Sequence, residues 1–128
     1  MSYYIEKEIN MKFEDAVEKV KADLKTIGFG VLTEINIHEK FKEKLDVDFR
    51  KYTILGACNP PLAYKALQQE DKIGTLLPCN VILQEKEKDK INVAAIDPVE
   101  SMQAVKNDEV KEIAKEVRAL LADFIYHL

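Results

Sequence analysis

The stretch Tyr52-Thr53-Ile54-Leu55-Gly56-Ala57-Cys58-Asn59-Pro60-Pro61 indicates how this chain folds. Residues 52–58 are apolar on both alternating faces, a pattern typical of a strand in the interior of a sheet. Asn59 is a favourable N-cap residue, and Pro60 suits a first helical turn because no backbone donor is needed there. The stretch therefore predicts a buried strand that leads directly into a helix.

The residues before this stretch predict, in chain order, a strand, a helix, a second strand and a short helix. Tyr3–Ile9 has strand alternation, although Lys7 interrupts its apolar face. Helical spacing of apolar residues runs from Phe13 to Ile27, and Gly28 then provides a helix stop that tolerates a left-handed backbone. A half-buried strand is expected from Phe29 to Ile37. A short charged helix, His38–Leu45, should follow, held in place by Phe41 and Leu45.

The residues after the stretch predict a hairpin and a long helix. Leu76–Glu85 and Lys90–Asp97 have the composition of strands, and the charged segment between them indicates an antiparallel turn. The residues from Asp97-Pro98 to Asn107 have no regular period. From Val110 to Leu128, apolar residues hold helical spacing for about five turns.

This element order, β-α-β-(short α)-β-(short α)-β-β-α, predicts an α+β fold in one domain spanning residues 1–128. Five strands with two long amphipathic helices favour one sheet with the helices packed on one face, because each helix needs an apolar surface to cover. The order does not fit a doubly wound parallel sheet.

Composition excludes several classes of function. The 128 residues carry 19 Lys and Arg against 23 Asp and Glu, a formal net charge of −4, which disfavours nucleic acid or an anionic membrane as a partner. Membrane-spanning apolar runs and a signal-like N-terminus are both lacking in the sequence, which predicts a cytoplasmic protein. Cys58 and Cys79 are too few for a disulfide framework and too far apart for a CxxC pair.

Two similar motifs are the strongest candidates for a site. Cys58-Asn59-Pro60 ends one predicted strand, and Pro78-Cys79-Asn80 begins the next. If the strand ends meet, Cys58 and Cys79 could bind a soft metal ion, and Cys58 could be reactive because a helix N-terminus lowers the pKa of a nearby thiol. The alternative is that small residues fill crowded strand ends while the asparagines cap turns.

Three further motifs have weaker chemical implications. His38 shares a predicted face with Glu34 and Asn36, so it could act as an acid or base or bind a divalent ion, or it could simply be solvated. The glycines of Gly28-Phe29-Gly30 follow a helix, the reverse of a dinucleotide fingerprint. Asp97-Pro98 could direct a carboxylate to a pocket, but a plain strand exit is the simpler interpretation.

These motifs resemble the family known as domain of unknown function 302. The similarity rests on Tyr52–Ala63 and Gly74–Val81, with support from the Gly28-Phe29 turn and the Asp97-Pro98 exit, and it extends over nearly the whole chain. It implies an α+β fold similar to a single-repeat TATA-binding-protein-like architecture, in members that associate as homodimers. It implies no established activity. The family's characteristic positions correspond to Cys58, Asn59, Pro60, Pro78, Cys79 and Asn80.

Three functional hypotheses follow. The first is a cytoplasmic homodimeric binding module that holds a small ligand or a metal ion near the two motifs. Its expected site residues are Cys58, Asn59, Pro60, Cys79, Asn80 and His38, with Cys58 and Cys79 as the metal ligands. The second is a thiol-dependent enzyme with Cys58 as nucleophile and His38 as base. The third is a structural or protein-interaction domain without a small-molecule site. The sequence does not identify a cofactor.

Overall fold

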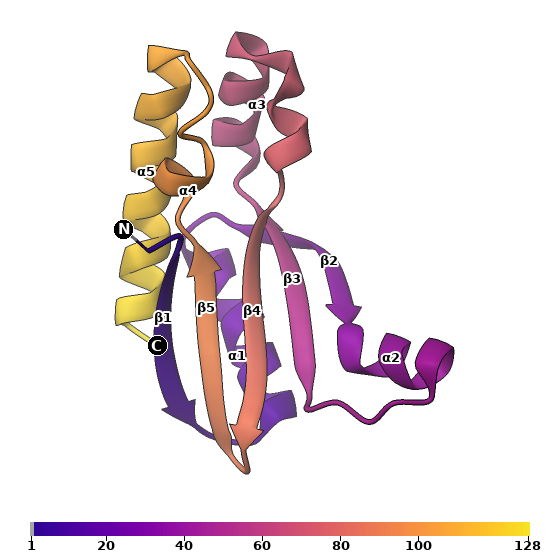
Figure 1. Cartoon of the computed structure of the whole chain (residues 1–128). Coiled ribbons are helices and arrows are strands. Elements are labelled where there is room, and N and C mark those ends of the chain that lie inside the picture. Colours follow the sequence, from indigo (N-terminus) through magenta and orange to yellow (C-terminus); the bar gives the residue numbers. More distant parts are fainter. Residues whose placement is uncertain (1) are drawn as a thin grey trace.

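The computed structural model describes residues 2–128, which form one antiparallel five-stranded sheet with the strand order β1-β5-β4-β3-β2 (Figure 1). The strands are β1 (Tyr4–Asn10), β2 (Gly30–Asn36), β3 (Tyr52–Cys58), β4 (Cys79–Glu87) and β5 (Lys90–Ile96). The helices are α1 (Phe13–Thr26), α2 (Ile37–Leu45), α3 (Pro60–Gln69), the 3₁₀ helix η1 (Asp71–Leu76), α4 (Pro98–Ser101) and α5 (Asp108–Tyr126). The α+β class and the single sheet agree with the prediction.

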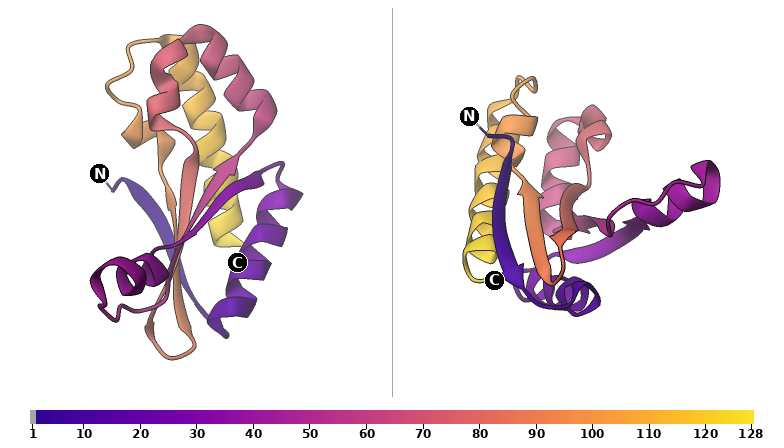
Figure 2. Two further views of the ribbon diagram at one scale, coloured as in Figure 1. Left: turned by 90° about the vertical axis from the view of Figure 1, so that its right-hand side faces the viewer. Right: turned by 60° about the horizontal axis from the view of Figure 1, so that its bottom comes forward.

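Helices α1 and α5 cover one face of the sheet, as the element order predicts (Figure 2). Their apolar stripes pack on the inward-facing residues of the three middle strands, for example Leu55, Val81 and Val93, each of which is fully buried. The alternation of the strands places these residues on the same face, so the sheet and the two helices enclose one main core.

Lys7 interrupts the apolar face of β1, and the fold gives its charge a partner. Its Nζ donates hydrogen bonds to the backbone oxygens of Tyr126 and Leu128, at 3.0 and 2.7 Å. These oxygens lie at the C-terminal end of α5, where the helix dipole is negative and carbonyl groups lack intrahelical donors. The lysine therefore ties β1 to the end of the longest helix.

A second, smaller core lies beyond the ends of the strands. Figure 1 shows α3, η1 and the first half of α5 rising past the end of the sheet where β3 and β5 finish and β4 begins. Ala66, Ile73, Met102, Val110 and Ala114 pack together there. The sheet does not reach this cluster, so helices alone enclose it.

The strand predicted at Phe29–Ile37 is observed as β2, but it is not half-buried throughout. β2 is an edge strand, and a bulge between Val31 and Thr33 leaves Leu32 unpaired opposite β3. The extra residue shifts the alternation, so Leu32 is 65% exposed and Ile35 is 42% exposed. A bulge depends on pairing with the neighbouring strand, which the local alternation does not report.

The expectation that Phe41 and Leu45 hold α2 in place is met for Phe41, which packs edge-to-face on Phe49 at 5.3 Å between ring centroids, but it is wrong for Leu45. None of the residues of α2 is buried, and Leu45 is 65% exposed. The helix projects from the end of β2 on the side of the sheet opposite α1 (Figure 2), where no core is available to it. Its apolar spacing therefore describes a surface helix.

Two boundaries also differ from the prediction. The strand expected from Leu76 begins only at Cys79, because residues 71–76 form η1. The segment expected to be irregular after Asp97 contains the short helix α4. Across residues 2–128, no helix is both long and apolar enough to cross a bilayer.

Candidate functional site

The two Cys-Asn motifs meet at a single cavity. Strand pairing sets Ala57, at the end of β3, directly opposite Cys79, at the start of β4. Cys58, Asn59 and Cys79 all line a cavity of about 340 Å³. The cavity lies between the main core and the second cluster, so residues of both clusters contribute to its wall.

The wall of this cavity is almost entirely apolar. Helix α3 contributes Leu62 and Ala66, η1 contributes Ile73, and α5 contributes Ala114 and Val117. Among residues 2–128, none of those lining the cavity carries a charge. Leu32 and Leu67, which also line it, are largely exposed, so the cavity reaches the surface beside β2 and α3. Its volume falls within the range of pockets that hold small organic molecules.

Burial disfavours the thiolate form of both cysteines in this wall. Both cysteines are free, with Cys58 half-buried and Cys79 8% exposed. Burial raises the pKa of Cys79 to about 11, with a smaller contribution from the neighbouring Cys58. Burial also raises the pKa of Cys58. This differs from the expectation that the start of α3 would lower the Cys58 pKa: desolvation of the thiolate dominates at this position.

The Asn59 side chain has a structural role. Its side-chain Oδ1 accepts a hydrogen bond from the backbone N–H of Leu62 at 3.2 Å, which confirms the predicted N-cap of α3. Its Nδ2 lies close to Gly28, where a Cβ atom would come within 3.2 Å. Gly28 has φ +85°, in the left-handed region expected for the stop after α1.

The other expected site residues lie elsewhere. Pro60 is exposed in the first turn of α3, and Asn80 is exposed on the uncovered side of β4. His38 lies beside Tyr52, at the far end of β3, with its Nδ1 2.9 Å from the Tyr52 backbone nitrogen. Seven strand residues separate the two ends of β3, a span of about 20 Å, so His38 cannot reach Cys58.

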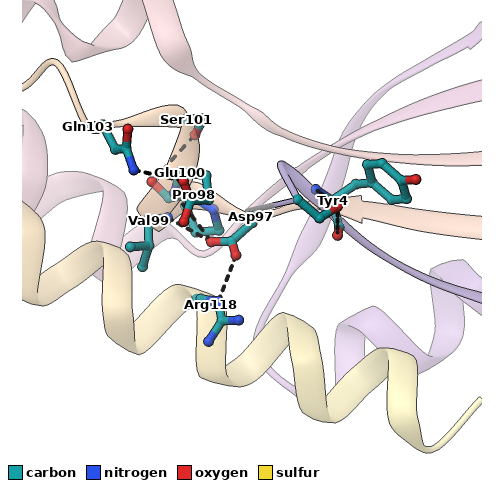
Figure 3. Close-up of polar contacts among 9 residues, drawn as sticks. Tyr4, Asp97, Pro98, Val99, Glu100, Ser101, Gln103 and Arg118 are labelled. Atoms are coloured by element: carbon teal, nitrogen blue, oxygen red, sulfur yellow. Dashed lines mark hydrogen bonds and ion pairs between the residues drawn. The ribbon is translucent and has the colours of Figure 1, made fainter.

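The Asp97-Pro98 exit is a structural support for the cavity. Asp97 is 4% exposed; one carboxylate oxygen accepts backbone hydrogen bonds from Val99 and Glu100, and the other accepts from Arg118 Nε at 2.7 Å (Figure 3). The carboxylate thus caps α4 and links it to α5. Pro98, the next residue, lines the cavity. The simpler interpretation of this motif, a strand exit, fits the observed contacts.

Sequence reasoning missed the helical residues of the wall. Small residues such as Ala63, Ala66 and Ala114 leave the space that larger side chains would fill. The alanines of α3 and α5 were a usable signal, since small residues on the inward faces of two helices can mark a gap between them. Whether the alanines of α3 and α5 face the same space depends on how these two helices pack, and the helices are about 50 residues apart in the sequence.

A tetrahedral metal centre is not formed around the thiols. Within residues 2–128, no group of three or more His, Cys, Asp or Glu side chains is placed to hold a metal ion. Structural zinc sites use four such ligands and catalytic ones at least three. Cys58 and Cys79 therefore form a pair without a third ligand of these types.

Comparison with known proteins agrees with this architecture. The crystal structure of an uncharacterized conserved DUF302 protein from Bacillus stearothermophilus is 26% identical in sequence, superposes with a TM-score of 0.89, and covers 98% of this chain and 97% of its own. No curated protein matches the chain. The model of the family described as domain of unknown function DUF302 matches residues 5–128. The chain therefore belongs to the DUF302 family.

Proposed function

We propose that this protein is a single-domain, cytoplasmic, homodimeric binding module whose cavity receives a small, neutral and largely apolar ligand. The observation that carries the proposal is the 340 Å³ cavity at the meeting point of the two Cys-Asn motifs. An apolar pocket of this volume that opens to the surface is typical of a small-molecule site. Residues of both Cys-Asn motifs line this space, which supports a role for it.

The chemistry of the wall favours a neutral ligand. An ion would lose its hydration on entry and find no charged partner among the residues lining the cavity, which is unfavourable by several kcal/mol. The two protonated thiols are weak hydrogen-bond donors, and the Asn59 carbonyl is already bonded to the start of α3. Affinity would therefore come mainly from burial of apolar ligand surface.

Metal binding and thiol catalysis have less support than binding of a neutral ligand. Metal binding by Cys58 and Cys79 requires both thiols to lose their protons, and burial raises the pKa of each. Thiol catalysis requires a base close to Cys58, whereas His38 lies at the opposite end of β3. A reducing cytoplasm suits two free cysteines that line one cavity.

Binding of a neutral apolar fluorophore, N-phenyl-1-naphthylamine, tests this function. We expect saturable binding with enhanced, blue-shifted emission from the wild-type protein. The substitution Ala66→Phe places a ring in the cavity and should weaken binding at least ~10-fold, a loss of about 1.4 kcal/mol. Ala119→Phe, at an exposed position of α5 outside the cavity, is the matched control and should bind as the wild type does.

Thermal unfolding of both variants, followed by circular dichroism, shows whether they are folded. A folded Ala66→Phe variant that binds the fluorophore with unchanged affinity would place binding outside the cavity and overturn the proposal. Absence of saturable binding by the wild type would overturn it as well.

A further inference from the structure

We infer that the uncovered face of the sheet is the surface through which two copies of this chain associate, about a two-fold axis that sets Glu6 of one copy opposite Arg50 of the other. We call this surface the open face. Its residues include Tyr4, Glu6, Glu8, Ile35, Tyr52, Ile54, Asn80, Ile82, Gln84, Lys86, Asn92, Ala94 and Ile96. The inference rests on the homodimer of the proposed function and names the surface that forms it.

The middle of the open face is apolar. Strand pairing aligns Ile35, Ile54, Ile82 and Ala94 in one row across β2, β3, β4 and β5. Helices α1 and α5 lie on the other side of the sheet (Figure 2). Along the row Ile35 is 42% exposed, Ile54 and Ile82 are half-buried, and Ala94 is 9% exposed. Apolar side chains gathered on an uncovered sheet face are typical of a protein interface.

A hydrogen-bonded row of polar side chains borders the apolar residues. Arg50 Nε donates to Gln84 Oε1 at 2.9 Å, and Gln84 Nε2 donates to Asn92 Oδ1 at 3.1 Å. Asn92 Nδ2 in turn donates to Glu6 Oε1 at 2.8 Å. The row therefore has a cation at one end, an anion at the other, and two amides between them.

This arrangement is complementary to itself. Consider a two-fold axis in the plane of the interface, perpendicular to the polar row and passing through its midpoint. Rotation about this axis places the second copy's row over the first copy's row in the opposite order. Each Glu6 then faces the other copy's Arg50, and each Asn92 faces the other copy's Gln84. A symmetric dimer requires such a match, because the same patch must serve both copies. Opposite charges at the two ends also fix the register of the complex.

The helix α2 and the segment that follows it border the open face on the same side. Figure 2 shows α2 on the side of the sheet opposite α1. Leu45, Val47 and Phe49 are 65%, 47% and 38% exposed, and none of the residues of α2 is buried. Phe49 packs against Phe41 and Tyr52 of its own chain. Leu45, Val47 and Phe49 all keep exposed apolar surface that a second copy on the open face would bury.

The available surface area agrees with a dimer that uses both the open face and the exposed side chains of residues 45–49. Five strands of about seven residues give a face of roughly 24 by 23 Å, or about 550 Å². A stable interface of standard size buries about 800 Å² on each partner. The sheet alone falls short of that value, and the exposed side chains of residues 45–49 provide a source for the remainder.

Charge reversal tests the assignment. Sedimentation equilibrium of the wild-type protein should give a dimer of twice the 14.7 kDa chain mass. Glu6→Arg and Arg50→Glu each bring like charges together, and each should raise the dimer dissociation constant at least ~10-fold. The double variant exchanges the two charges and should return to within about 3-fold of the wild type. Glu116→Arg, on the exposed side of α5, is the control and should leave association unchanged.

The outcomes separate the homodimer from its surface. A monomer at every concentration would overturn both. A dimer that the single reversals leave unaffected, or that the double variant does not restore, would overturn the open face alone. If a reversed variant does not fold, hydrogen exchange of the wild type replaces it: the backbone amides of α2 should gain protection as concentration rises, and unchanged exchange in α2 would reject this surface.

Discussion

At the scale of single residues, Gly56 shows how closely the strands approach near the cavity. A Cβ atom at this position would overlap Thr33 Oγ1 on β2 and come within 2.8 Å of Pro78 Cγ, which precedes β4. Gly30, on β2, has no heavy atom within 4 Å of the equivalent position. Close packing therefore requires glycine at position 56 but not at position 30, and the sequence alone does not show this difference.

We predict that Gly56→Ala lowers the free energy of unfolding by about 1–3 kcal/mol, because the added methyl group forces its neighbours apart. Gly30→Ala should change it by less than about 0.5 kcal/mol or stabilise the protein slightly, since alanine loses less backbone entropy than glycine. Urea unfolding of both variants measures the difference. Equal effects of the two substitutions would contradict the assigned overlap.

Cys79 links the stability of the protein to pH. Its folded-state pKa of about 11 lies above the ordinary thiol value of 9.0, so folding favours the protonated form. The stabilisation is complete below pH 9 and is lost as pH rises through 11. At pH 11 the loss is about 2 kcal/mol.

The measurement is urea unfolding between pH 8 and 11, with the wild-type protein compared with Cys79→Ala. Lysine and tyrosine groups titrate in the same range, and the comparison removes their shared contribution. We expect the wild type to lose about 2 kcal/mol more than the variant. Cys58→Ala should keep most of the wild-type slope. Parallel curves for wild type and Cys79→Ala would show that the Cys79 thiol titrates normally.

At the scale of secondary-structure elements, strong local signals agree with the structure. The Asn59-Pro60 start of α3, the Gly28 stop after α1 and the long periodic helix α5 were all predicted. Each depends on residues adjacent in sequence. The bulge of β2 and the exposure of α2 depend on which strand and which core lie beside them, so the same local patterns could not report them.

Asp97 connects three elements and should be the most sensitive charged position. We predict that Asp97→Ala lowers the free energy of unfolding by about 2–4 kcal/mol, because α4 loses its cap and Arg118 loses its partner. Asp97→Asn should cost less, since its amide oxygen can still accept from Val99. Thermal or urea unfolding measures both variants. A loss below about 0.5 kcal/mol for Asp97→Ala would show that the ion pair contributes little.

At the scale of the whole molecule, the cavity results from two cores that meet without merging. The sheet core ends near Cys79, and the helical cluster begins at Ala66 and Ala114. Alanines at these positions are good helix formers, so the helices are stable while the space between them stays open. The position of the cavity at the strand ends is therefore a property of the fold together with its small residues.

The sequence by itself determined the class of fold, the element order and the family, because hydrophobic period, caps and the Cys-Asn motifs are local and survive any tertiary arrangement. It also identified the strand ends where the two cysteines meet. Only the tertiary structure decided that burial raises the pKa of both thiols, that His38 lies about 20 Å away and that α2 has no core to cover. Desolvation, strand register and strand order are properties of distant segments brought together, and no single stretch of chain encodes them.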